Sequence, residues 1–256
     1  MFTTNPFVAL TDWVSPAVLQ GYIVLMVLAV AVGTVFDLLH GQKIRFFLHA
    51  RRQAKAAATQ TLGAAVVAGI ATRTLAHDIA SFGEFCNPQR RMSHALMFYG
   101  FVLYLVTTLV MVFAYPTDAH PPPVLPVLWN LGVLMTLVGG YWFFFFLRVN
   151  VVHDGQPPWR LVRADLFIVS LLASVTFALL FALVALGGNV AATRVFAVLY
   201  IAFTTLLFGS VRWSKFAHMF YKPVMAFQRR FEAADGSSDL PAPTPAGDKR
   251  CPPSPT

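Results

Sequence analysis

The chain has 256 residues, of which 57% are hydrophobic and only 12% are charged, and its mean hydropathy is +0.64. This composition carries more apolar surface than one soluble core of that size can bury. It therefore excludes an ordinary soluble globular fold and predicts an integral membrane protein that contacts lipid. The chain has 19 Lys and Arg but only 11 Asp and Glu. We attribute this excess of positive charge to the cytoplasmic loops of a membrane protein, so we expect no nucleic-acid binding.

A helix needs about 20 mostly apolar residues to cross the hydrocarbon core of a membrane. Five stretches meet this length, at residues 17–39, 94–115, 127–148, 164–187 and 195–213. Residues 57–72 are also uncharged, but this stretch is short and poor in large apolar side chains, so we do not count it as a span. The sequence predicts an all-α bundle of five transmembrane helices within a membrane domain at residues 1–232.

The positive charges define the predicted orientation. Eight Lys and Arg lie between the first two spans, three lie between the third and fourth, and seven follow from Arg212 onward. With five spans these 18 residues share one side of the membrane, and only Arg194 lies on the other. Because Lys and Arg of short loops stay in the cytoplasm, we expect the N-terminus outside and the C-terminus inside. The first 16 residues contain no Lys or Arg, so we expect an uncleaved first helix rather than a signal peptide.

Two segments outside the spans have distinct compositions. Residues 41–91 mix apolar and basic side chains at helical spacing, which predicts amphipathic cytoplasmic helices on the membrane surface, with a solvated linker as the alternative. Residues 233–256 are rich in Pro, Ser and small residues and are predicted to be a disordered cytoplasmic tail. The two cysteines, Cys86 and Cys251, are too few for an iron–sulfur cluster or a disulfide framework.

Two histidines are the best candidates for a functional site. His94 begins the second span and His218 ends the fifth, in the segment RWSKFAHMFYKP, so the predicted topology places both at the cytoplasmic boundary. Imidazoles from two helices can supply both axial ligands of a b-type haem. Arg90, Arg91 and Lys215 lie three or four residues before these histidines, where they can pair with haem propionates. The alternative is that all five are interfacial residues without a cofactor.

Glycines in the second and third spans are ambiguous. Gly100, Gly139 and Gly140 can bring a flat ring close to the backbone, but close packing between helices explains them equally well.

The segments LAHDIASFGEFCNPQRRMSHALMFYGF and WSKFAHMFYKP resemble the haem b membrane subunits related to the gamma subunit of respiratory nitrate reductase. The resemblance is closest to the membrane subunit of the quinone-interacting membrane oxidoreductase and the membrane anchor of adenylylsulfate reductase. It implies two stacked haems between the second and fifth spans, with the counterparts of His94 and His218 serving the haem nearer the cytoplasm. Tyr104 and Tyr200 stand where the family places its second histidine pair, so we expect one haem here.

The spacing along the helices leaves the depth of the two tyrosines open. At 1.5 Å per residue, Tyr104 lies about 15 Å from His94 along the second span and Tyr200 about 27 Å from His218 along the fifth, so the two tyrosines need not be level.

The resemblance implies an electron-transfer subunit in a bacterial inner membrane, rather than a stand-alone enzyme with catalytic residues. It would link quinone to a soluble cytoplasmic oxidoreductase of sulfur metabolism, similar to adenylylsulfate reductase, through one haem b. The alternative is a haem-free structural anchor for such an enzyme. A transporter is less favoured, because no Asp, Glu, Lys or Arg lies in the middle of a span.

Overall fold

The structure is a computed structural model that describes residues 3–40, 43–83, 85, 87–148, 161, 165–211 and 218–238. All elements in these residues are helical, which confirms the all-α prediction. The elements are η1 (Pro6–Leu10), α1 (Pro16–His40), α2 (Lys43–Ala57), α3 (Ala64–Arg73), η2 (Thr74–Ala80), α4 (Pro88–Ala114), α5 (Val124–Trp142), η3 (Phe143–Leu147), α7 (Leu166–Leu186), α8 (Val190–Gly209) and α9 (His218–Asp235).

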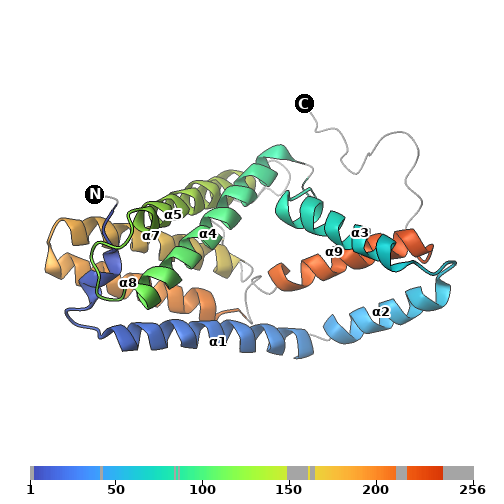
Figure 1. Cartoon of the computed structure of the whole chain (residues 1–256), viewed down its shortest axis with the longest axis horizontal. Coiled ribbons are helices and arrows are strands. Elements are labelled where there is room, and N and C mark those ends of the chain that lie inside the picture. The colour runs from blue at the N-terminus through green and yellow to red at the C-terminus, as the bar shows by residue number, and fades with distance from the viewer. Residues whose placement is uncertain are drawn as a thin grey trace. The chain divides into compact units, whose positions relative to one another are not determined.

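Five helices among the described residues are long and apolar enough to cross a membrane (Figure 1). They are Pro16–Leu39, Pro88–Ala114, Val124–Leu147, Leu166–Leu186 and Val190–Gly209, which confirms the five predicted spans. The third span joins α5 to η3, a short π-helix. The uncharged stretch at residues 57–72 contributes to α3, which has only 10 residues and is too short to span.

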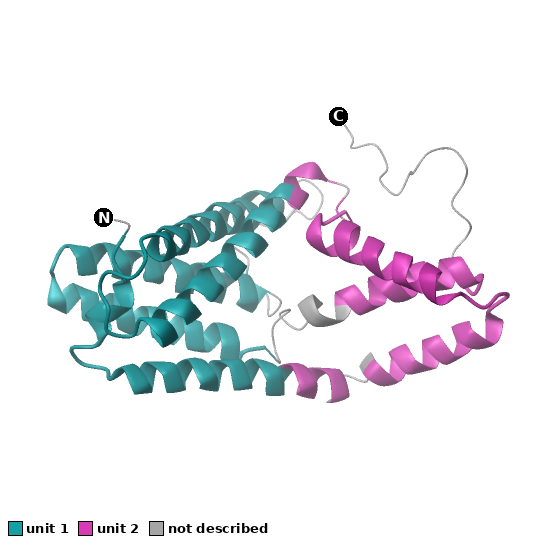
Figure 2. Ribbon diagram, in the orientation of Figure 1, with its two compact units in different colours: residues 1–33, 92–215 teal, residues 34–91, 216–256 magenta. Residues whose placement is uncertain are grey.

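The chain divides into two compact units, drawn in teal and magenta in Figure 2. We call the first the bundle unit, which comprises Met1–Gly33 and Met92–Lys215. The second, Thr34–Arg91 and Phe216–Thr256, is called the accessory unit. Helix α4 begins in the accessory unit and continues into the bundle unit.

Helix α7 is the central element of the bundle unit. Leu171, Val175, Ala178 and Phe181 lie along it and are each at most 1% exposed. This helix is apolar on all sides, as expected for a buried helix inside a membrane protein. Helix α1 instead exposes large apolar side chains along its length, such as Val18 and Leu25, which in a membrane would contact lipid.

Helices α4 and α5 pack closely through glycines. A Cβ atom added to Gly100 would lie 2.6 Å from the backbone nitrogen of Thr136, and one added to Gly139 would lie 2.7 Å from that of Met97. The Ser93 hydroxyl reinforces this contact by donating to the Gly139 carbonyl oxygen at 2.8 Å. Gly140 faces the Leu172 side chain of α7. Close helix packing therefore accounts for these glycines, and their small size need not serve to make room for a flat ring.

The accessory unit is built from α2, α3, η2 and α9. The chain after α2 is tied to the end of α9, because the Thr59 backbone N–H donates to the Asp235 carbonyl oxygen at 3.0 Å. Helix α9 ends there and is followed by Gly236 at a φ of +80°, a usual stop for a helix. The predicted amphipathic segment is thus helical over α2, α3 and η2. Most of the predicted tail (239–256), together with Cys86 and Cys251, lies outside the described residues.

Candidate functional site

His94 lies near the start of α4, in the bundle unit. The Asn87 side chain caps this helix by accepting from the Gln89 backbone N–H at 2.8 Å, and an Asn in this position is a typical helix start. Ser93 is fully buried against α5, whereas His94 is partly exposed. His94 lies inside the second of the five spans, Pro88–Ala114.

The other predicted residues divide between the units. Arg90 and Arg91 are exposed on the first turn of α4, and Arg91 donates through Nε to the Ser81 carbonyl oxygen at 2.6 Å. His218 is the first residue of α9 in the accessory unit, rather than part of the helix that forms the fifth span, which ends at Gly209. Lys215 lies outside the described residues. The structure therefore describes His94 and His218 each within its own unit.

Tyr104 and Tyr200 contact each other inside the bundle unit. Their hydroxyl oxygens lie 2.5 Å apart, and the two residues are only 5% and 7% exposed. The 27 Å estimate for Tyr200 assumed one continuous helix to His218, but α8 ends at Gly209 and α9 starts at His218. The estimate therefore does not apply, and α4 and α8 bring the two tyrosines to the same level.

Aromatic rings surround the tyrosine pair. The Trp129 ring lies 5.8 Å from that of Tyr104, and the Phe181 ring lies 6.4 Å from that of Tyr200. The Trp129 indole N–H donates to the Thr108 hydroxyl at 3.0 Å, which satisfies its polar group in this apolar interior. Protein side chains fill the space between α4 and α8 at this level.

The tyrosine hydrogen bond leads to a stability prediction. Tyr104→Phe should destabilise the protein by about 1–3 kcal/mol, because it leaves the buried Tyr200 hydroxyl without this partner. The Tyr104→Phe, Tyr200→Phe double variant should lose less than the sum of the two single variants. Unfolding in mixed micelles measures these differences. Tyr141→Phe is the matched control, since its hydrogen bond to Thr176 is exposed; strict additivity of the buried pair would contradict the predicted coupling.

An ion pair that the sequence did not predict joins the third and fourth spans. The Arg148 guanidinium, placed just after η3, donates to the Asp165 carboxylate at the start of α7. Their side chains are only 8% and 12% exposed, and the Arg148 guanidinium also lies 4.5 Å from the centre of the Phe144 ring. Arg148 is thus a paired, largely buried group rather than a solvent-exposed charge.

Asp165→Ala should destabilise the protein by about 3–5 kcal/mol, because it leaves the buried Arg148 guanidinium without this carboxylate. Asp12→Ala, at an exposed position near α1, is the control and should change stability little. Thermal unfolding of both variants in the same detergent provides the comparison. Equal stabilities of the two variants would mean that the ion pair contributes no net stability.

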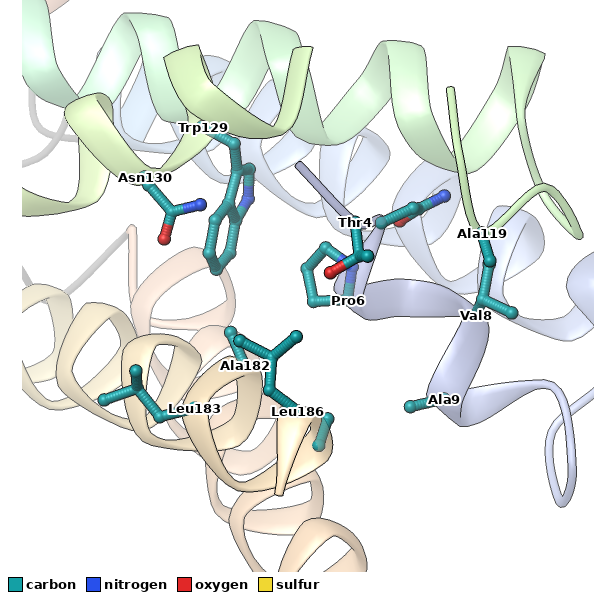
Figure 3. A pocket seen from close by; sticks show the side chains of 12 residues that line it. Thr4, Pro6, Val8, Ala9, Ala119, Trp129, Asn130, Ala182, Leu183 and Leu186 are labelled. Carbon is teal, nitrogen blue, oxygen red and sulfur yellow. The ribbon is translucent and has the colours of Figure 1, made fainter. Parts of the chain in front are cut away.

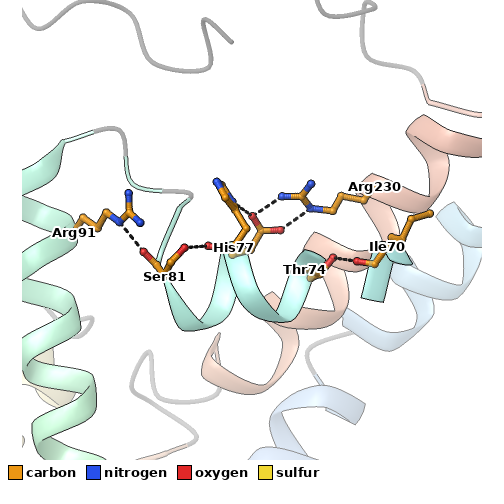
Figure 4. Close-up of polar contacts among 7 residues, drawn as sticks. Ile70, Thr74, His77, Ser81, Arg91 and Arg230 are labelled. Carbon is orange, nitrogen blue, oxygen red and sulfur yellow. Dashed lines mark hydrogen bonds and ion pairs between the residues drawn. The ribbon is translucent and has the colours of Figure 1, made fainter. Parts of the chain in front are cut away.

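A polar cluster in the accessory unit connects η2 with α9 (Figure 4). Asp78 accepts from Arg230 Nε at Oδ2 and from the second guanidinium nitrogen at Oδ1, both at 2.7 Å. His77 Nδ1 lies 2.9 Å from the same Oδ1. The hydrogen bonds from Arg230 hold the pKa of the Asp78 carboxyl below its ordinary value. The cluster includes His77, a residue within the family-like segment for which the sequence suggested no role.

A cavity of about 310 Å³ opens in the bundle unit among the N-terminal segment, α5 and α7 (Figure 3). Trp129, Asn130 and Leu186 line it together with Asn5. The Asn5 amide donates to the carbonyl oxygen of Tyr115, just beyond the end of α4. The cavity thus lies at the end of α4 that is about 30 Å from His94 along the helix axis. It is therefore remote from His94.

Groups of three or more His, Cys, Asp or Glu placed to hold a metal ion are absent from the described residues. Axial haem ligation needs only two such side chains, so this finding does not bear on the predicted His94 and His218 pair. Searches of protein-family models, curated proteins and solved structures found no match to this chain.

Proposed function

We propose that this protein is an electron-transfer subunit that passes electrons between membrane quinone and a soluble oxidoreductase in the cytoplasm. The observation that carries the proposal is the packed Tyr104–Tyr200 pair between α4 and α8. Where the resembling family has its outer histidine pair, these helices carry hydrogen-bonded tyrosines, while His94 lies near the start of α4. This arrangement supports a single haem b on the cytoplasmic side.

The donor chemistry suits a haem. His94 and His218 belong to different helices, α4 and α9, and neutral imidazoles are the axial ligands that give a low-spin b-type haem. When bound, the haem would supply one-electron chemistry through its iron. Arg90, Arg91 and Lys215 would contribute positive charge toward the propionates, with Arg91 oriented by its hydrogen bond to Ser81.

The partner chemistry rests on the resemblance. A soluble enzyme of sulfur metabolism, similar to adenylylsulfate reductase, would exchange electrons with the haem at the cytoplasmic face of a bacterial inner membrane. The exposed arginines of α2 in the accessory unit, Arg45, Arg51 and Arg52, would favour an acidic surface on that enzyme, because complementary charges speed association.

Anaerobic addition of a reduced naphthoquinol to the purified protein tests the electron-transfer proposal. After mixing, we expect the haem absorption bands to change to those of the reduced form. The amount of quinol oxidised should match the amount of haem reduced, at two haems for each quinol. A protein whose haem is reduced by dithionite but not by quinol would contradict the proposed link to quinone.

A single haem on the cytoplasmic side also predicts little charge movement across the membrane. In proteoliposomes, quinol oxidation coupled to a soluble electron acceptor should leave a potential-sensitive dye unchanged, because electrons need not cross the apolar layer. The control is an ionophore-induced potential in the same vesicles, which establishes the response of the dye. A dye response during turnover would mean that charge crosses the bilayer.

A second candidate function is a haem-free membrane anchor for the soluble enzyme. The tyrosine pair and its aromatic neighbours favour this function too, since their side chains pack directly against one another between α4 and α8. The two functions differ in one property, which is whether the isolated protein contains haem.

A further inference from the structure

Helix α2 of the accessory unit carries only positive charge. Its 15 residues include five Lys and Arg and no Asp or Glu. Arg45, Arg52 and Lys55 are all exposed, and within the described part of the chain none of the three is paired with a carboxylate. The helix therefore presents cations that no described acidic side chain neutralises.

Three of these cations share one side of α2 with a leucine. Residues spaced three or four positions apart lie on the same face of a helix, and this spacing connects Arg45, Leu48, Arg52 and Lys55. Leu48 lies between the two arginines and is 43% exposed. We call these four side chains the basic stripe. It combines three positive charges with an exposed apolar group.

Helix α2 has little protein around it. In the accessory unit α9 packs against η2 and α3, whereas α2 makes only sparse contact with the other described elements. Outside the basic stripe, Phe46 is also 72% exposed. Large apolar side chains left in water lose the stabilisation that burial gives. A helix that exposes both basic and large apolar side chains is typical of helices at a membrane surface.

The chain connection keeps α2 close to the membrane (Figure 1). Helix α1 contains the first span, Pro16–Leu39, and α2 begins at Lys43, four residues after the end of that span. Four residues reach at most about 14 Å, so the first turn of α2 lies in the headgroup region or directly beside it. Clusters of Lys and Arg in this position are typical of sites that attract anionic lipid headgroups.

We propose that the basic stripe of α2 binds an anionic phospholipid. The guanidinium groups of Arg45 and Arg52 would donate to the phosphate oxygens, and Leu48 between them would enter the interfacial layer of the membrane. The lipid would thus hold α2 at the membrane surface. Attraction of an acidic enzyme is compatible with this contact, because it acts at a distance and Arg51, outside the stripe, contributes to it. The inference needs no haem and so stands independently of the proposed function.

Native mass spectrometry of the full-length protein in detergent tests the proposal. Titrations with phosphatidylglycerol and with phosphatidylcholine of the same acyl chains give the affinities for an anionic and a zwitterionic headgroup. The test protein is the Arg45→Gln, Arg52→Gln double variant. The matched control is the Arg73→Gln, Arg229→Gln double variant, which removes two exposed arginines from α3 and α9 of the same unit and changes the net charge equally.

We expect the wild type to bind phosphatidylglycerol about tenfold more tightly than phosphatidylcholine, or better. The stripe variant should lose about tenfold or more of its phosphatidylglycerol affinity, since each cation near an anionic membrane surface contributes about fivefold. Its phosphatidylcholine affinity should not change, and the control should match the wild type. Wild-type phosphatidylglycerol affinity in the stripe variant, or an equal loss in the control, would overturn the proposal.

The same variants distinguish a lipid from an acidic protein as the occupant of the stripe. A polyglutamate peptide provides the probe, added to the wild type and to the stripe variant without lipid. Binding of the peptide to the wild type alone, combined with equal phosphatidylglycerol affinity of the two proteins, would overturn the lipid site and assign the stripe to an acidic protein surface.

Discussion

His94→Ala should abolish haem binding, because it removes one of the two proposed axial ligands. Substitution of a single ligand leaves the iron with one imidazole, and such a site loses most of its affinity as well as its low-spin state. Haem per chain, measured by pyridine haemochromogen after purification in detergent, is the readout. We expect it to fall from one to nearly none.

His120→Ala is the control for this loss. His120 is exposed in the connection between α4 and α5 and is not a proposed ligand, so its haem content should equal that of the wild type. Retention of a full complement of haem in a folded His94→Ala variant would exclude His94 as a ligand.

Gly139→Leu should destabilise the bundle unit by about 3 kcal/mol or more, since overpacking of a tight interface forces helices apart. Even its Cβ atom would lie 2.7 Å from the Met97 nitrogen and from the Ser93 carbonyl oxygen, and both are backbone atoms that cannot rotate away. Displacement of α4 from α5 would also move the turn that carries His94. Thermal unfolding and size-exclusion profiles measure the effect.

The matched control is Gly21→Leu, the same substitution in another spanning helix. Gly21 lies on α1 with no atom within 4 Å of an added Cβ, so the new side chain would extend into open space that lipid occupies in a membrane. We expect its stability to equal that of the wild type within about 1 kcal/mol. If both variants were equally destabilised, the loss of stability could not be attributed to the tight α4–α5 contact at Gly139.

The five spans were predictable because hydropathy over about 20 residues is a local property of the sequence. The predicted ranges therefore agree with the helices, for example 127–148 with Val124–Leu147. The continuation of the fifth span toward His218 was not predictable in the same way. A single glycine inside an apolar run, here Gly209, does not by itself identify the end of a helix. In the structure α8 ends at Gly209 and α9 starts at His218.

Long-range polar pairs were the features that the sequence could not reveal. Arg148 and Asp165 pair across the connection between the third and fourth spans, yet in the sequence each resembles an ordinary charge at a span end. Asp78 and Arg230 are 152 positions apart, and neither residue type nor local spacing identifies the partner. Tyr104 and Tyr200 contact each other because α4 and α8 are aligned so that the two residues lie at the same depth in the bundle. This alignment follows from helix packing and cannot be derived from the spacing of residues along either helix.

The most direct test of the central claim is the haem content of the purified wild-type protein, from a dithionite-reduced minus air-oxidised optical spectrum with haem quantified per chain. The proposed electron carrier predicts one b-type haem per chain. Two haems per chain would contradict the single-haem arrangement. A folded protein without haem would contradict the electron-transfer proposal and leave the membrane anchor as the remaining function.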